Sequence, residues 1–101
     1  MWLLVMFDLP TDTKKARKEY AKFRKFLLED GFHQMQYSVY SRHVPSRENA
    51  EVHINRVQSW LPPDGEVRIL TCTEKQFERM YVFFGKIRKS AEKPSQQLTF
   101  F

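Results

Sequence analysis

The stretch Met1-Trp-Leu-Leu-Val-Met-Phe-Asp8, followed by Leu9-Pro10, decides the fold. A short apolar run that a proline ends is typical of a strand buried on both faces. Asp8 therefore stands at the carboxyl end of a central strand, an edge where open α/β sheets often bind ligands. From the residues alone, an acid at this position serves either as a metal ligand or as the partner of a nearby arginine or lysine.

The composition is that of one folded domain. The chain has 101 residues, of which 42% are hydrophobic and 15% aromatic, so it can bury a modest core and would gain from pairing with a second copy. Its single cysteine, Cys72, lies in a strand-like segment and is expected in the core. The sequence has neither a signal peptide nor an apolar run long enough to cross a bilayer, so we expect a cytoplasmic protein without a membrane partner.

The positive charge is concentrated in one segment. Residues 14–25 hold seven basic residues against one acidic residue, whereas the rest of the chain sums to −1. An ordinary exposed helix face would intersperse acidic residues among the basic ones, so we favour binding of a phosphate backbone over simple solvation. The cations assigned to this nucleic-acid interface are Lys14, Lys15, Arg17, Lys18 and Lys22, together with Arg42 from a later predicted strand.

The basic segment is predicted to be a helix. Thr11 or Asp12 can cap its N-terminus, and Gly31 can end it. Stepping round the helical wheel places the basic residues off a narrow apolar stripe, so the stripe is expected in the core. The stripe consists of Ala16, Tyr20, Phe23 and Leu27.

Periodicity and turn signals predict the middle of the chain. Residues 33–44 alternate in polarity, as a half-buried strand does, and their polar face would meet a nucleic-acid backbone, a second subunit or only water. A second helix begins at Pro45-Ser46 and ends before Pro62-Pro63. Residues 66–73 are a further predicted strand.

The last third of the chain changes from apolar to polar and back. Thr73 and Gln76 can form a capping box for a short helical turn, and residues 80–85 fit either the end of that turn or a strand. Residues 86–96 have the composition of a polar linker. The β-prone tail 97–101 is expected to dock on a sheet edge of its own or of a second copy.

Several of these stretches together resemble the CRISPR-associated protein two family, the small subunit of spacer acquisition. They are Phe7-Asp8-Leu9-Pro10, the basic helix, Gly31-Phe32, and Gln36-Tyr37-Ser38-Val39-Tyr40. Three further segments are most similar to the type II branch of that family: Asp8-Leu-Pro-Thr-Asp-Thr-Lys-Lys-Ala-Arg17, Thr73-Glu-Lys-Gln-Phe77 and the tail Gln97-Leu98 through Phe101.

The resemblance implies a ferredoxin-like β-α-β-β-α-β domain that forms a homodimer. It would place this domain at residues 1–85, the polar linker at 86–96, and at 97–101 a dimer-exchange strand that completes the partner's sheet. That fold needs two strands before its second helix, so a bend between Ser38 and Arg42 is expected to divide the strand predicted there. The interface residues of the exchange strand would be Leu98, Phe100 and Phe101.

The resemblance also implies a metal site at Asp8. This aspartate would face its counterpart near the dimer axis and hold Mg²⁺ there as the catalytic carboxylate. Such a site is chemically reasonable, because Mg²⁺ commonly uses one or two carboxylates and keeps several waters, one of which could attack a phosphodiester. A single carboxylate per chain is little for a nuclease, but a dimer supplies two.

Two classes of function follow. The first is a metal-dependent endonuclease that acts on single-stranded RNA or duplex DNA. The second is a non-catalytic bridge that joins two dimers of the CRISPR integrase, CRISPR-associated protein one, while its basic helices hold the protospacer duplex. We favour the bridging role, which needs only a dimer and the basic helix. A stand-alone RNA-binding module ranks last, because residues 35–44 and 66–73 lack its aromatic signature.

Overall fold

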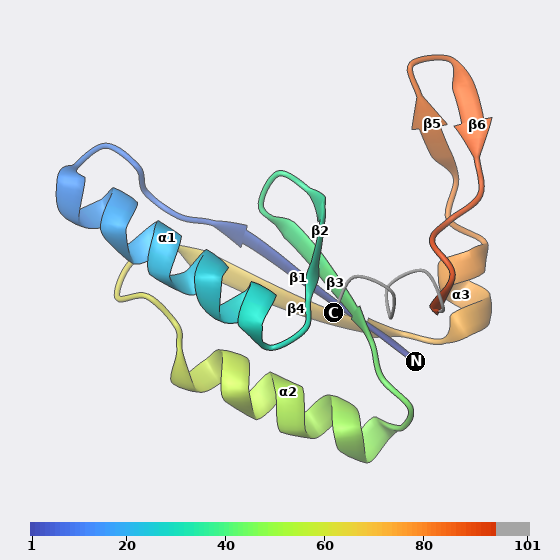
Figure 1. Cartoon of the computed structure of the whole chain (residues 1–101), viewed down its shortest axis with the longest axis horizontal. Coiled ribbons are helices and arrows are strands. Elements are labelled where there is room, and N and C mark those ends of the chain that lie inside the picture. Colours follow the sequence, from blue (N-terminus) through green and yellow to red (C-terminus); the bar gives the residue numbers. More distant parts are fainter. Residues whose placement is uncertain (95–101) are drawn as a thin grey trace.

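The apolar stretch that opens the chain forms an interior strand of a four-stranded antiparallel sheet (Figure 1). The computed structural model describes residues 1–94, and the expected tail strand with Leu98, Phe100 and Phe101 lies outside them. The elements are β1 Trp2–Asp8, α1 Lys14–Glu29, β2 His33–Gln36, β3 Val39–His43, α2 Arg47–Ser59, β4 Glu66–Cys72, α3 Glu74–Glu78, β5 Val82–Phe84 and β6 Ile87–Lys89.

The first six elements have the expected ferredoxin-like β-α-β-β-α-β order, with the strands arranged β2-β3-β1-β4. In β1, Val5 lies opposite Tyr40 of β3 and Ile69 of β4, which sets the register on both sides. No helix within residues 1–94 combines the length and the hydropathy needed to span a bilayer.

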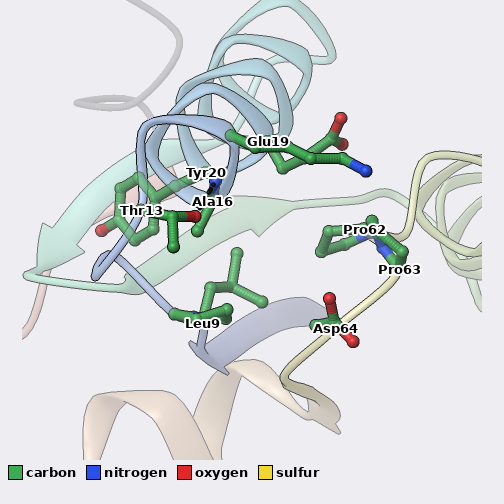
Figure 2. A pocket seen from close by; sticks show the side chains of 10 residues that line it. Leu9, Thr13, Ala16, Glu19, Tyr20, Pro62, Pro63 and Asp64 are labelled. Carbon is green, nitrogen blue, oxygen red and sulfur yellow. Dashed lines mark hydrogen bonds between the residues drawn. The ribbon is translucent and has the colours of Figure 1, made fainter.

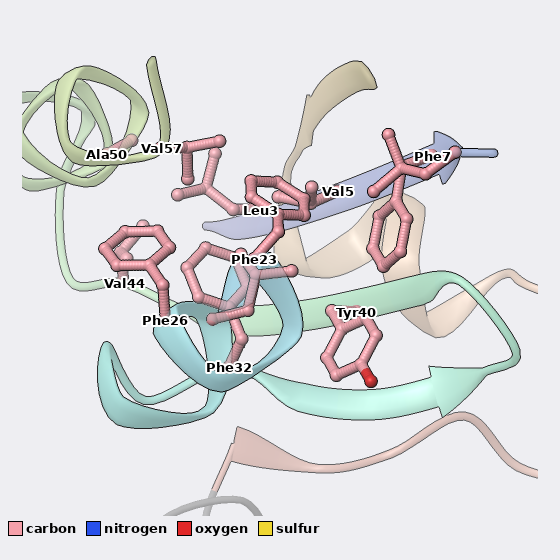
Figure 3. Packing of buried hydrophobic residues seen from close by; sticks show 12 residues of the cluster. Leu3, Val5, Phe7, Phe23, Phe26, Phe32, Tyr40, Val44, Ala50 and Val57 are labelled. Atoms are coloured by element: carbon pink, nitrogen blue, oxygen red, sulfur yellow. The ribbon is translucent and has the colours of Figure 1, made fainter. Parts of the chain in front are cut away.

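The main core lies between the sheet and the two long helices (Figure 3). Leu3, Val5 and Phe7 point from β1 toward this layer, as the alternation of side chains along a strand requires. The strand-facing side of α1 contributes Phe23, and α2 contributes Val57. The apolar stripe predicted for the basic helix therefore does face the core.

The structure corrects the predicted N-cap of α1. The cap is Thr13, whose Oγ1 accepts a hydrogen bond from the backbone N–H of Ala16 at 3.0 Å. Thr11 and Asp12 also carry suitable oxygens, but the helix begins at Lys14, so only residue 13 lies at the correct distance from the free N–H groups. At the other end, Gly31 follows the helix with a φ of 89°, as predicted.

The bend expected between Ser38 and Arg42 is confirmed at Ser38. β2 ends at Gln36 and β3 begins at Val39, and Ser38 takes a φ of 61° in the turn between them. Two hydrogen bonds hold this turn, one between the Tyr20 hydroxyl and Ser38 Oγ at 2.9 Å and one from the Phe7 N–H to the Ser38 carbonyl at 3.0 Å.

The opposite face of the sheet has a smaller cover. Phe77 of α3 stacks on Trp2 with ring centroids 3.9 Å apart and an interplanar angle of 7°, and Leu4 completes this second buried cluster. Partly buried Cys72 packs against the same cluster, as expected for a core cysteine. The cover therefore protects one end of this face only.

A capping box and the side chain of Glu74 stabilise the start of α3. The predicted capping box of Thr73 and Gln76 is present at its start. The same Glu74 oxygen accepts from the Met1 amine and contacts His43 Nε2, each at 2.8 Å. The hydrogen bonds from the amine and from the imidazole lower the pKa of Glu74 to about 2, so its carboxylate stays charged when the solution is mildly acidic.

A separate hairpin follows α3. Residues 80–85, for which a helix end and a strand were both possible, contain the strand β5. The linker predicted from composition at residues 86–96 is wrong at residues 87–89, which form β6. The hairpin extends away from the four-stranded sheet (Figure 1). Its exposed large apolar side chains are Tyr81, Phe83, Phe84 and Ile87.

A buried polar network joins α1, α2 and β3. His53 Nε2 accepts a hydrogen bond from Arg42 Nε at 3.2 Å, so the ring proton lies on Nδ1 and is donated to Asp30 Oδ2 at 2.7 Å. Arg56 donates to the other oxygen of Asp30 at 2.9 Å. The side chains of His53 and Asp30 are only 5% and 8% exposed, so His53 Nδ1 and Asp30 Oδ2 rely on each other in place of water.

We expect Asp30→Asn to lower the free energy of unfolding by about 2 kcal/mol, because an amide N–H₂ would face a buried donor. Chemical denaturation measures the loss. Glu29→Gln is the matched control, since this exposed carboxylate lies 3.9 Å from Lys25 and should contribute less than about 0.5 kcal/mol. Equal effects of the two substitutions would contradict the network.

Candidate functional site

Asp8 ends β1 with an exposed side chain. Because side chains alternate along a strand, Asp8 points to the same face as Met6, away from the two long helices. Its cross-strand neighbour is Glu66 of β4. Among the described residues, no cation forms an ion pair with Asp8. Of the two roles considered for this acid, the partner of an arginine or lysine is therefore the one that the geometry does not support.

The neighbouring carboxylate is already engaged. Arg68 Nε donates a hydrogen bond to Glu66 Oε1, which lowers the pKa of Glu66 and raises that of Arg68. Arg68 itself lies opposite Met6 in the sheet. The sequence analysis did not single out Glu66. Only the pairing of β1 with β4 places it beside Asp8, and the sequence does not give that register.

The described residues do not gather a full set of metal ligands around Asp8. Within residues 1–94, no three His, Cys, Asp or Glu side chains come close enough together to hold a metal ion. Mg²⁺ can bind through one or two carboxylates and retained waters, so the exposed Asp8 fits it as a single ligand.

The backbone after Asp8 is held by a close approach of Gly65. This glycine has a φ of 94°, and a Cβ added to it would lie 2.7 Å from the Asp8 carbonyl oxygen. Beside this contact, the loop at residues 62–64 and the start of α1 enclose a pocket of about 100 Å³ (Figure 2). Small-molecule sites usually enclose about 300–1,000 Å³, so this pocket is too small for a nucleotide.

The cations assigned to α1 are all exposed and lie on its outer surface. Arg17 is oriented by a hydrogen bond to the Thr11 carbonyl at 3.1 Å. Within the described chain, Lys14, Lys15 and Lys18 form no ion pair with an acidic group, so their charge faces solvent uncompensated. Lys22 lies over the ring of Trp60. Because a short loop joins β1 to α1, the first of these cations lie at the same end of the sheet as Asp8 (Figure 1).

Arg42 is not part of this group. It lies opposite Leu3 on the helix-covered face of the sheet and donates to His53. Burial lowers the pKa of its guanidinium. Arg42 shares a face of β3 with Tyr40, as alternation requires, but the long helices cover that face, so the residue expected on a polar face points toward α2 instead.

A family model described as CRISPR associated protein Cas2 matches residues 1–80. The chain belongs to the Cas2 family. It is 59% identical over 101 residues, the whole of both chains, to a protein of Parvibaculum lavamentivorans named CRISPR-associated endoribonuclease Cas2. A Cas2 of Flavobacterium psychrophilum with the same name is 50% identical, over 100% of this chain and 88% of that protein. The family assignment made from the sequence is confirmed.

A solved Cas2 structure has the same fold. The crystal structure of Streptococcus pyogenes Cas2 at pH 6.5 matches with a TM-score of 0.61 and 22% identity, over 83% of this chain and 100% of that chain. At this identity the likeness concerns the fold alone. The assignment to the type II branch of Cas2 stays a prediction.

Gly65→Ala should destabilise the protein more than Gly85→Ala. Both glycines have positive φ, so each alanine should cost about 1–2 kcal/mol from backbone strain. Only the Cβ at position 65 would also clash with the backbone at Asp8, because the space around Gly85 is open to at least 4 Å. Urea denaturation of the two variants gives the comparison, and equal losses would rule out the close approach.

Proposed function

We propose that this Cas2 protein acts in spacer acquisition as a dimer that binds protospacer duplex DNA and joins two dimers of the CRISPR integrase. The observation that carries the proposal is the outer surface of α1, where exposed lysines face solvent without acidic partners. Clustered cations of this kind gain affinity for a nucleic-acid backbone by releasing its counterions. The role requires no chemistry from the bridging subunit itself.

Homodimer formation is supported by the sheet face that carries Asp8. On that face Leu70 of β4, opposite Leu4, is 51% exposed, and Met6 and Val39, which lie opposite each other, are only half-buried. Exposed apolar surface on a sheet face favours association with another surface. A second copy that packs its own sheet here would bury these residues, and the tail with Leu98, Phe100 and Phe101 would add to the interface.

The duplex would contact the beginning of α1. Lys14, Lys15, Arg17 and Lys18 occupy its first turns, and Lys22 follows one turn later. Such contacts to phosphate oxygens fix the position of a protein on DNA but read no sequence. In this proposal, the protein therefore binds duplexes of any sequence, as the acquisition of varied spacers requires.

Charge reversal of Lys14, Lys15, Arg17 and Lys18 to glutamate should weaken duplex binding and flatten its salt dependence. The slope of log K against log salt should become shallower by about one for each phosphate contact that is lost. Fluorescence anisotropy over a salt series measures both quantities. Arg47→Glu is the control, because Arg47 is an exposed cation at the start of α2, and unchanged binding by the α1 variant would remove this helix from the interface.

A second function, metal-dependent phosphodiester cleavage, is favoured by a separate observation. Asp8 is exposed and has no cationic partner in the described part of the chain, and the relatives named above are called endoribonucleases. In the proposed dimer, Asp8 of each copy would hold Mg²⁺, which supplies an activated water and neutralises charge on the phosphate. The substrate would be single-stranded RNA or duplex DNA.

Asp8→Asn should reduce cleavage by about a hundredfold or more while leaving binding intact, since the loss of a metal ligand removes several kcal/mol of transition-state stabilisation. Labelled RNA and duplex DNA are incubated with each protein, with Mg²⁺ or with chelator. Asp12→Asn is the control, an exposed aspartate in the loop before α1. If the proteins bind the duplex and none of them cleaves a substrate, the nuclease function is excluded and the bridging role stands.

A further inference from the structure

Trp60 is an exposed aromatic residue beside the basic helix. It follows the last residue of α2 and forms its C-cap. Its side chain is 45% exposed, whereas the other tryptophan, Trp2, is 1% exposed. An exposed tryptophan indicates a contact surface better than an exposed aliphatic residue does, because burying its large ring would bring a larger gain in free energy.

Contacts from α1 hold the indole in a defined orientation. The ring of Phe26 stacks on it with centroids 5.2 Å apart and an interplanar angle of 12°. Since Phe26 covers one face of the indole, the exposed area belongs to the opposite face and the ring edges. The Lys22 ammonium lies 5.8 Å from the ring centroid, near the outer limit of a cation–π contact. The Lys22 ammonium can therefore move to contact a phosphate without the loss of a strong cation–π interaction.

This pairing of a flat ring with a lysine suits an unpaired nucleobase. Proteins that bind single strands combine cations for the backbone with aromatic rings on which bases stack, in a way that tolerates any base. Bases inside a duplex are already stacked on each other and cannot reach such a ring. The positive charge of α1 supplies the complementary field for the phosphates on either side of the base.

We propose that Trp60 and Lys22 form a stacking site for an unpaired base of single-stranded nucleic acid, with the base on the indole and its phosphate on the Lys22 ammonium. The inference rests on the proposed nucleic-acid binding by α1 and adds to it a preference for an unpaired segment. The competing explanation is that Trp60 only covers Phe26 and contacts no ligand.

Trp60 provides its own signal for the test. Because Trp2 is buried, nucleic acid added to the protein can reach only Trp60, so quenching of tryptophan emission reports on this ring. The probes are oligouridylate, oligothymidylate and a long linear duplex of mixed sequence, which has few ends per phosphate. We expect both single strands to quench the emission at saturation and the duplex to quench it far less. Quenching by one single strand alone would support the site and show which of the two strands it prefers.

Variants separate stacking from charge. Trp60→Ala should weaken binding of the single strands by about tenfold, as expected for the loss of one stacked base, and should change duplex binding little. Trp60→Phe keeps an aromatic ring on Phe26 and should retain most of the affinity, so a folding defect in the alanine variant can be recognised. Lys22→Ala should weaken single-strand binding more than Lys25→Ala, because Lys25 lies beside Glu29.

The outcomes distinguish this inference from the proposed function. If no nucleic acid binds in a salt-dependent way, the role of α1 fails and the stacking site fails with it. If binding is salt-dependent but the tryptophan emission does not respond and Trp60→Ala binds single strands normally, the stacking site alone is wrong. Equal quenching by the duplex and by the single strands would also overturn it.

Discussion

The rest of the structure depends on β1 being apolar on both faces. The helices bury one face of this strand, and α3 buries only the end of the other face that carries Trp2. Side chains alternate along the strand, so Asp8 shares the less protected face with Met6 and Trp2. The exposed carboxylate and the surface that a second copy would cover are consequently parts of one face. In this fold, the placement of the acid and the exposure of apolar side chains beside it have the same origin.

The two candidate sites, the cations for nucleic-acid binding and the carboxylate for cleavage, lie on different layers of the fold. The cations belong to the helix layer, whereas the carboxylate belongs to the open face of the sheet, and the core stands between the two layers (Figure 3). A ligand held on α1 is therefore not brought to Asp8 by that contact alone. This separation gives a physical reason why nucleic-acid binding and phosphodiester cleavage could be retained or lost independently in one small domain.

The sequence predicts the elements well where a local rule applies. The apolar run and the capping box of Thr73 follow from patterns of a few residues, whereas the turn near Ser38 was expected only because the fold implied by the family resemblance needs two strands there. The N-cap of α1 could not be chosen, because neighbouring residues all carry a suitable oxygen. The burial of Arg42 depends on the helices that cover its face of β3. The role proposed for Trp60 depends on its contacts with Phe26 and Lys22, which are distant in sequence. Geometry of this kind arises from tertiary packing.

The contact between Glu74 and the Met1 amine bears on how the protein is prepared. One carboxylate oxygen serves both the amine and His43, and the helix that begins at Glu74 carries the ring that stacks on Trp2. Any affinity tag fused ahead of Met1, or residues left after its removal, would turn the ammonium into a neutral amide. Material tagged at that end would lose the charge of one contact that holds α3, while the His43 contact and the Trp2–Phe77 stack would remain.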